Sequence, residues 1–383
     1  MSTHNQAGPL AGIRVIEMAA IGPVPHCGLV LAEMGADVVR LDRTETAELG
    51  VAVPPPYDAL ARGKRSVALD LKDADGLRSA RGLIAGADAL LEGFRPGVME
   101  RLGLGPDACL TANPRLVYGR ISGWGDSGPL AREAGHDLNF LGLTGALLAM
   151  GAAGAPPPVP LNLVADFGGG AMQLACGVLA ALLSVRATGR GQVVATSIYE
   201  GANALLPFAH GLRAAGVWTD RRGDNLLDGG APFYRTYAAA DGQYVAVAAI
   251  EPKFYRALLT GLGLHEVVNP SAQFDRASWA GTAALFAERF VARPRDDWTA
   301  WFAGTDACVS PVLGWAAAAA HPQAAALRGF AETDGVTLPR TAARFSATPC
   351  GAPRPASPPG ADTRAVLIEV GMALHGAATR RRP

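Results

Sequence analysis

The first 41 residues alternate short apolar runs with a helical pattern. Residues 13–18 form an apolar run, residues 19–25 form a loop of Gly and Pro, and residues 26–34 carry apolar positions at helical spacing. A second apolar run covers residues 36–41. Short apolar runs predict buried strands, and the segment between them predicts a helix. The chain therefore opens with a predicted βαβ unit.

The same alternation continues further along the chain. Residues 88–91, 115–121 and 193–198 are strand-like, and helical stretches separate them. Strands that alternate with helices predict a parallel, doubly wound sheet with helices on both faces. We therefore predict an α/β protein with a large Rossmann-like domain.

A different pattern begins near Asp228. Two strand-like runs flank Asp241-Gly242, which is typical of a hairpin turn, and Pro252 starts a helical stretch. This pattern predicts a smaller α+β domain. The predicted division has four parts: the first part of the large domain (1–196), a helical linker (197–227), the small domain (228–327), and a return segment with the C-terminal tail (328–383). Within the last part, residues 349–359 contain five prolines and predict an irregular strap.

Composition excludes several classes of partner. The 383 residues carry 34 basic and 34 acidic side chains, so net charge gives no reason to expect nucleic acid or an anionic membrane. The apolar run Leu174 to Val185 is shorter than the roughly 20 residues that span a bilayer. Five cysteines lack metal-site spacing, and neither chain end carries a secretory or peroxisomal signal. We expect a bacterial, cytoplasmic, metal-free enzyme.

The end of the second predicted strand suggests an anion site. Asp42 stands where a ribose-binding acid would stand in a dinucleotide fold, but residues 21–25 lack the second and third glycines of GxGxxG. Arg43 follows at the edge where open α/β sheets bind ligands. A solvated charged face explains any one of the cations that follow, but together they outline a phosphate site: Arg62, Lys64, Arg65, Lys72, Arg95 and Arg101.

Residues 135–170 include the imidazole of His136 and the carboxylate of Asp166. A reaction that removes a proton from one face of a carbon and returns it to the other face needs two such groups. Structural roles also fit each residue alone: a buried core histidine, and an N-cap before the apolar helix 171–185. Capping and catalysis are compatible roles for Asp166.

Several motifs together resemble one family. They are, in order, PLAGIRVIEMAAIGPVPH, ADVVRLDR, GKRSVALDLK, FRPGVMERLGLGP, GHDLNF, NLVADFGGG, NLLDGGAPFY and AIEPKFY. The chain resembles the α-methylacyl-CoA racemases, which belong to the family III CoA-transferases, also called CaiB/BaiF proteins. The resemblance extends from about residue 9 to about residue 345.

This resemblance implies an isomerase that interconverts (2R)- and (2S)-2-methylacyl-CoA thioesters through an enolate. His136 and Asp166 would remove the α-proton from opposite epimers, and Glu251 would bond the second ring nitrogen of His136. Coenzyme A would be part of the substrate, and no separate cofactor is expected. The resemblance also implies an interlocked homodimer with shared active sites, in which Glu251 reaches His136 of the other chain.

By the same resemblance, two groups of residues hold coenzyme A. The adenosine-phosphate end would contact Arg43, Leu69, Asp70, Leu71, Lys72, Gly93, Phe94, Arg95 and Arg101. The backbone of Gly135, Asp137, Leu138, Asn139 and Phe140 would hold the pantetheine arm, and Asp137 could also tune the site electrostatically.

Two rival functions share this fold. A family III CoA-transferase would use Asp166 as a nucleophile that forms acyl-anhydride and thioester intermediates. In such a transferase, His136 is not expected, and the glycine-run loop of formyl-CoA transferases is not apparent here. A non-catalytic CoA-binding protein would have no need of His136, Asp166 and Glu251 together.

Overall fold

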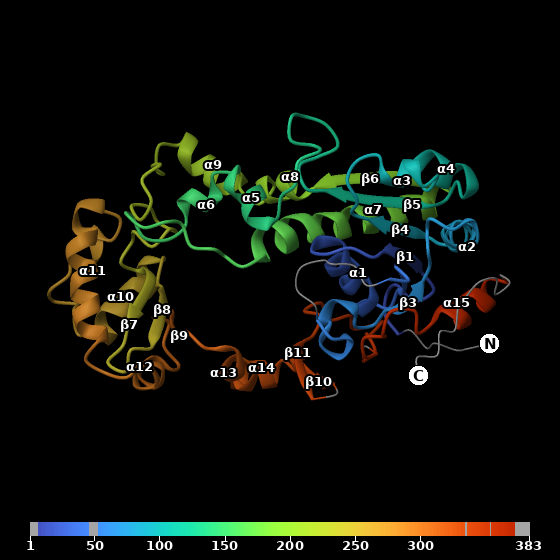
Figure 1. Cartoon of the computed structure of the whole chain (residues 1–383). Helices are drawn as coiled ribbons and strands as arrows, with labels where there is room; N and C mark the ends of the chain where they lie inside the picture. Colours follow the sequence, from blue (N-terminus) through green and yellow to red (C-terminus); the bar gives the residue numbers. More distant parts are fainter. Residues whose placement is uncertain (1–6, 46–52, 334, 353, 372–383) are drawn as a thin grey trace. The chain divides into compact units, whose positions relative to one another are not determined.

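The computed structural model describes residues 7–45, 53–333, 335–352 and 354–371 (Figure 1). The chain divides into two compact units: unit 1 comprises Met1–Thr144, Pro160–Leu205 and Pro322–Pro383, and unit 2 comprises Gly145–Val159 and Leu206–His321. The two chain ends on which the cytoplasmic expectation rests lie outside the described residues.

Unit 1 contains a six-stranded sheet in which every paired strand runs parallel to its neighbour. The strand order is β3-β2-β1-β4-β5-β6. The strands are β1 (Arg14–Met18), β2 (Asp37–Asp42), β3 (Arg65–Ala68), β4 (Ala89–Glu92), β5 (Val117–Ser122) and β6 (Gln192–Ser197). This arrangement confirms the predicted doubly wound sheet. The strand β3 was not predicted, because it is only four residues long and begins with Arg65 and Ser66, which are polar.

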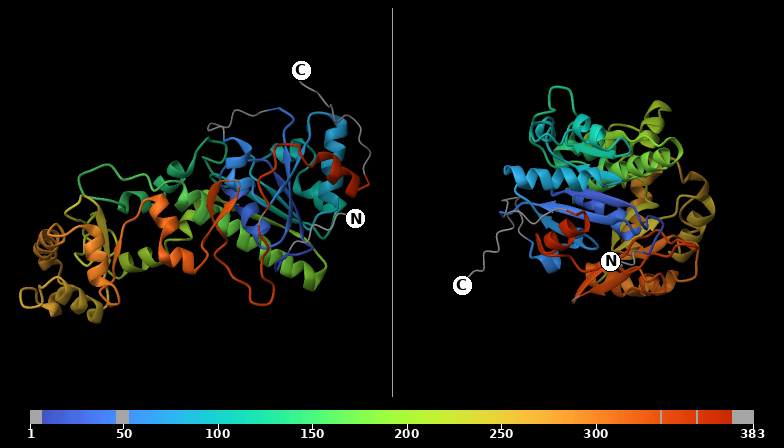
Figure 2. Two further views of the ribbon diagram at one scale, coloured as in Figure 1. Left: turned by 90° about the horizontal axis from the view of Figure 1, so that it is seen from below. Right: turned by 90° about the vertical axis from the view of Figure 1, so that its right-hand side faces the viewer.

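Helices cover both faces of this sheet. The helices α1 (Pro23–Glu33) and α7 (Met172–Thr188) contact one face. The core of the other face includes side chains from α2 (Ala74–Ala85), α3 (Val98–Arg101), α4 (Pro106–Ala112) and α15 (Thr363–Glu369). The helix α15, red in Figure 2, lies beside β3 and buries Val366 and Leu367.

A π-helix, Leu163–Ala171, runs directly into α7. Together they form a continuous helix of 26 residues whose most apolar stretch has a mean hydropathy of 1.6, long enough by itself to cross a bilayer. The sequence-based length was too short, because the helix begins at Leu163 and not at residue 171. Packing of α7 on β5 and β6 accounts for its apolar composition.

The π-helix lies against α8 (Ile198–Asn203) with almost no side chain between the two backbones. A Cβ on Gly169 would lie 2.6 Å from the backbone nitrogen of Ala202, and a Cβ on Gly201 would lie 2.5 Å from the carbonyl oxygen of Gly169. No other residue type fits at these two positions without displacing backbone. The glycines therefore fix the position of the π-helix within unit 1.

The remaining elements of unit 1 are short. They are α5 (Asp137–Gly142), the antiparallel pair β10 (Phe330–Thr333) and β11 (Val336–Pro339), α14 (Pro322–Ala326), and 3₁₀ turns at Pro55–Tyr57 and Ala59–Ala61. The proline-rich segment 349–359 contains no helix or strand among its described residues.

Unit 2 is built on a three-stranded antiparallel sheet of β7 (Tyr234–Ala238), β8 (Tyr244–Ala248) and β9 (Val309–Pro311). Gly242 turns the β7–β8 hairpin at φ 73°, which confirms the predicted hairpin. Aromatic rings fill the core, and Phe233 and Tyr255 meet edge to face at 5.4 Å. The helices are α6 (Ala146–Ala149), α9 (Pro207–Ala214), α10 (Pro252–Gly261), α11 (Arg276–Phe290), α12 (Arg295–Phe302) and α13 (Trp315–Ala320), with a 3₁₀ turn at Pro270–Ala272.

The sequence predicted a helical linker over residues 197–227, and the structure has two separate helices there. The first, α8, ends at Asn203, and α9 begins at Pro207. Proline at the first position of a helix has no N–H to continue a preceding helix. The boundary between the two units falls in this break.

Candidate active site

The strand order places the candidate site at the carboxyl edge of the sheet in unit 1. β1 lies beside β4 at the centre of the sheet. The connections after these two strands lead toward opposite edges of the sheet, and open α/β sheets bind ligands at such a switch point. The loop after β4 packs on the start of α1, since a Cβ on Gly93 would lie 2.7 Å from Cγ2 of Val24. Gly22, just before α1, faces Asp166 so closely that a Cβ there would lie 3.1 Å from its Oδ2.

Asp166 lies within the π-helix, so it is not the N-cap of a helix that starts at residue 171. Burial is the main cause that raises the pKa of its carboxyl from 3.8 to about 6, and the nearby Asp137 charge raises this pKa further. A hydrogen bond with the Asn162 side chain and the charge of His136 act in the opposite direction. A carboxyl with this pKa can be acid or base near neutral pH.

Asp137 connects the two segments that carry His136 and Asp166. Its side chain is buried, and its Oδ2 accepts hydrogen bonds from the backbone N–H groups of Ala165 at 3.0 Å and Asp166 at 2.7 Å. This carboxylate therefore caps the π-helix from a different segment. The sequence did not reveal this role, because the contact joins residues 28 and 29 positions apart.

His136 stands at the N-cap of α5, and its backbone N–H donates to Oδ1 of Asn139 at 3.1 Å. The residue is exposed, which contradicts its interpretation as a buried core histidine. The buried ring of Phe140 packs against Trp124 with ring centroids 4.7 Å apart. A Cβ on Gly135 would lie 2.8 Å from this ring, so glycine is needed just before His136.

Glu251 lies in unit 2, at the N-cap of α10, and its side chain makes no capping hydrogen bond. The residue is exposed and its carboxylate is available to a partner. The junction before it is fixed by Gln273, whose buried amide Nε2 donates to the carbonyl groups of Ala249 at 3.1 Å and Ile250 at 2.7 Å. Gln273 carried no motif signal in the sequence.

The candidate phosphate-binding side chains that remain available follow β2, β3 and β4. Arg43, Lys72, Arg95 and Arg101 are exposed, and none forms an ion pair within the described part of the chain. The neighbouring candidates occupy the same edge: Leu69 is buried, Asp70 accepts a hydrogen bond from the Lys72 N–H at 2.9 Å, and Leu71, Gly93 and Phe94 are at least partly accessible.

Lys64, predicted to help bind phosphate, is fully buried and paired inside the fold. Its Nζ lies 2.6 Å from Oε2 of Glu17 and donates to the carbonyl of Pro25 at 2.7 Å. Burial lowers the pKa of Lys64 and raises that of Glu17, although the two charges attract. Sequence alone could not separate this lysine from a solvated one.

Two arginines of the same predicted cation cluster are also engaged elsewhere. The buried Arg65 forms ion pairs with Asp37 and with Glu369 at 2.8 Å, and Arg62 pairs with Glu33. These contacts hold β3, β2 and α15 together. Arg62 and Arg65 are therefore structural cations and not phosphate ligands.

Glu92, at the end of β4, is a titratable residue that the sequence did not single out. Its Oε2 accepts from the Phe94 N–H at 2.9 Å, and its Oε1 lies 3.0 Å from Nε of Arg120. Burial is the largest influence and raises the pKa of Glu92 to about 7. The residue shapes the loop that presents Arg95.

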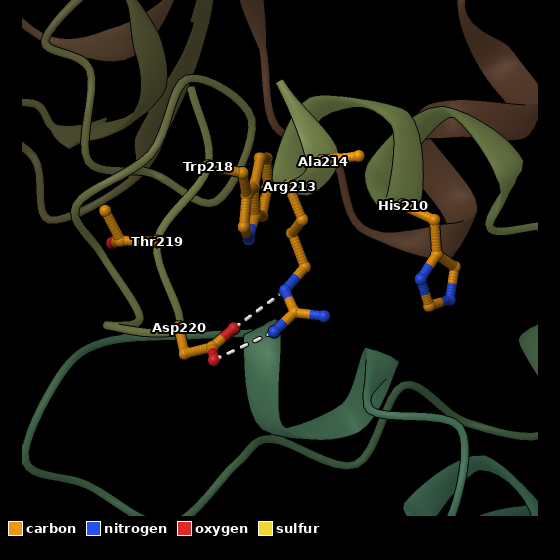
Figure 3. A pocket seen from close by; sticks show the side chains of 6 residues that line it. All are labelled: His210, Arg213, Ala214, Trp218, Thr219 and Asp220. Carbon is orange, nitrogen blue, oxygen red and sulfur yellow. Dashed lines mark hydrogen bonds and ion pairs between the residues drawn. The ribbon is translucent and has the colours of Figure 1, made fainter. Parts of the chain in front are cut away.

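A hollow of about 560 Å³ lies in unit 2 (Figure 3). It is lined by His210, Arg213, Ala214, Trp218, Thr219 and Asp220. Arg213 and Asp220 form a two-pronged ion pair at 2.8 and 2.9 Å, which neutralises both charges. None of the predicted site residues lines it. His, Cys, Asp and Glu side chains also form no group of three or more that could hold a metal ion among the residues with described positions.

The fold and the site define a class of protein. Residues 10–363 match the family described as CoA-transferase family III, and the chain belongs to this family. The fold is similar to that of a CaiB/BaiF family protein from Brucella suis, with a TM-score of 0.82 at 28% sequence identity over 95% of this chain and 100% of that one.

Two relatives indicate a branch within the family. The chain is 47% identical over 343 residues to the alpha-methylacyl-CoA racemase of Mus musculus, covering 89% of this chain and 87% of the relative. It is 46% identical over 306 residues to the alpha-methylacyl-CoA racemase of Homo sapiens, covering 79% and 78%.

The raised pKa of Asp166 predicts a pH-dependent stability difference. The carboxyl loses its proton near pH 4 when unfolded and near pH 6 when folded, so ionisation destabilises the fold increasingly across that window. Asp166→Asn removes this charge. The variant should therefore gain more in melting temperature over the wild type at pH 8 than at pH 4.5, as measured by thermal unfolding. A difference that does not depend on pH would show that Asp166 is not desolvated.

Proposed function

We propose that the protein is an α-methylacyl-CoA racemase that interconverts (2R)- and (2S)-2-methylacyl-CoA thioesters. One observation carries the proposal. The Asp166 carboxyl has a pKa near 6, and the backbone N–H of Asp166 donates a hydrogen bond to Asp137, the residue that follows the exposed His136. Two groups of this kind are what proton removal and return at one carbon require. Identity of 46–47% with two racemases supports the same reaction.

In the proposed reaction, ionised Asp166 removes the α-proton of one epimer, and the C–H electrons move into the thioester to form an enolate. Protonated His136 then returns a proton to the opposite face. The reverse reaction begins with neutral His136 and protonated Asp166. A carboxyl pKa of about 6 suits both directions, because an ordinary aspartate is rarely protonated near neutral pH.

The enolate oxygen needs hydrogen-bond donors. The N–H groups of Ala165 and Asp166 already donate to Asp137, so these two groups do not supply them. We assign this role to the N–H groups of Asp137 and Leu138. These are the first two residues of α5, so no carbonyl one turn earlier in that helix accepts their hydrogen bonds. Each such donor contributes about 10² to 10³ in rate.

Coenzyme A binding is assigned to the carboxyl edge of the sheet. The exposed Arg43, Lys72, Arg95 and Arg101 supply cations for its phosphates, and arginine can grip phosphate with two parallel hydrogen bonds. The segments Leu69–Lys72 and 93–95 would line the adenosine end. The pantetheine arm would run along residues 135–140 toward the two bases.

The complete site is proposed to form in a homodimer. Glu251 and His136 are both exposed and lie in different units of the chain, and neither has a fixed partner of opposite charge in the described residues. In the proposed dimer, Glu251 of one chain bonds the second ring nitrogen of His136 of the other chain. That bond would fix the ring and favour its charged form.

The first test is isotope exchange. Incubation of either epimer of a 2-methylacyl-CoA in D₂O should yield both epimers, with deuterium at the α-carbon, as measured by mass spectrometry and chiral analysis. Asp166→Ala and His136→Ala should each lower the rate of inversion by about 10² or more. Transfer of the CoA group to a free acid without α-deuteration would instead support a transferase with Asp166 as the nucleophile.

The second test concerns the coenzyme. Arg43→Ala should raise KM about tenfold with little change in kcat, because a phosphate contact far from the α-carbon is equally strong in the ground and transition states. Arg115→Ala is the matched control, since Arg115 is exposed just before β5, at the opposite edge of the sheet. Steady-state kinetics distinguish the two. A fall in kcat at unchanged KM in Arg43→Ala would contradict this placement of the coenzyme.

The third test addresses the shared site. Differentially tagged heterodimers of a His136→Ala chain and a Glu251→Ala chain would contain one site with both residues and one site with neither, if the site is shared. They should recover about half of the wild-type activity, given independent sites. Each mutant homodimer must be nearly inactive. Heterodimers no more active than the homodimers would place Glu251 and His136 of the same chain together.

A further inference from the structure

Asp137 holds the two proposed bases in a fixed relation. It directly follows His136 in the chain, and the backbone N–H of Asp166 itself donates to its carboxylate at 2.7 Å. The contact with Ala165 at 3.0 Å gives a second attachment on the same helix turn. We propose that Asp137 is a positioning residue that sets the spacing between His136 and Asp166 and, through its negative charge, keeps Asp166 able to act as an acid. This inference rests on the proposed racemase function.

The charge of Asp137 is not explained by capping alone. A neutral asparagine caps helix starts about as well as aspartate does. Asp137 is only 5% exposed, its Oδ1 has no hydrogen-bond partner, and it forms no ion pair in the described part of the chain. An incompletely paired carboxylate at such a position costs free energy. A charge retained at that cost indicates a task that a neutral cap cannot perform.

The negative charge of Asp137 acts on Asp166. The helices packed against the π-helix carry several ionisable groups, among them His26 on α1, His136 and Asp137 at the start of α5, and Glu200 on α8. His26 stacks on Phe167 and Glu200 bonds Ser197, whereas Asp137 and His136 act electrostatically on Asp166. Asp137 is the negative one of these two, and it raises the pKa of Asp166.

The backbone around the π-helix fixes the position of the segment to which Asp137 is bonded. The π-helix cannot move toward α8, because the contact of Gly169 with Gly201 is already backbone to backbone. Gly22 bounds Asp166 on another side. Asp137 therefore attaches the short helix α5 to the π-helix, whose position is fixed. His136 is the N-cap of α5, directly before Asp137.

The two roles of Asp137 separate in two variants. In Asp137→Asn, the amide oxygen can still accept both backbone hydrogen bonds, but the charge is lost. In Asp137→Ala, both the hydrogen bonds and the charge are lost. Asp362→Ala is the matched control, because Asp362 is a partly buried carboxylate of unit 1 that accepts from the Ser66 backbone N–H at 2.9 Å and belongs to no proposed site.

The first readout is the partition of the enolate. In D₂O, α-deuteration with retention needs one base, whereas inversion needs both bases at the correct spacing. Asp137→Ala should lower the ratio of inversion to exchange with retention about tenfold or more, because a misplacement of about 1 Å costs about 10² in rate. Asp137→Asn keeps both hydrogen bonds and should lower the ratio much less than Asp137→Ala does. Loss of folded protein alone lowers both rates together and leaves the ratio unchanged.

The second readout is the pH profile of kcat/KM, which reports the free enzyme. Loss of the Asp137 charge lowers the pKa of Asp166, so for the epimer whose α-proton Asp166 removes, the acid limb of the profile should move to lower pH in Asp137→Asn. Asp362→Ala should lower the melting temperature but leave both the limb and the ratio unchanged.

An unchanged ratio in Asp137→Ala would overturn the positioning role, and an unchanged acid limb in Asp137→Asn would overturn the role of the charge. Both outcomes are distinct from failure of the proposed function. In that case, the wild-type enzyme itself would show no α-proton exchange.

Discussion

Two hydrogen bonds from the start of the π-helix to Asp137 join the segments that carry the two proposed bases. They bring the residue after His136 to the backbone of Asp166 itself. The rest of unit 1 supports this contact. The sheet places the loops of β1, β4 and β5 at one edge, and the glycines at 169 and 201 let the π-helix lie deep enough to reach that edge.

The buried ion pairs divide the cations of unit 1 into two groups. Lys64 with Glu17, and Arg65 with Asp37 and Glu369, hold the start of α1, the strands β1, β2 and β3, and α15 together. Breaking such a pair leaves an uncompensated buried charge, which is strongly destabilising. The candidate cations that stay exposed, Arg43, Lys72, Arg95 and Arg101, follow the strands at the carboxyl edge, where an anionic substrate can reach them.

Much of the fold could be predicted from the sequence, as could the place of Arg43 in it. Short apolar runs separated by helical patterns predicted the parallel sheet, and Asp241-Gly242 predicted the hairpin of unit 2. These features are encoded by neighbouring residues, so local periodicity and turn chemistry suffice. Likewise, the position of Arg43 directly after a predicted strand indicated its place at the carboxyl edge of the sheet.

Contacts between distant residues were decided only by the tertiary structure. Lys64 and Arg43 have the same kind of charge in the sequence, but only Lys64 meets a buried glutamate 47 positions away. The Asp166 carboxyl acquires a pKa near 6 from burial and from the Asp137 charge, neither of which a local pattern records. The sequence by itself determined which residues could carry charge or protons. The folded chain decided which of them are buried, paired or free, because burial and pairing depend on neighbours brought together by folding.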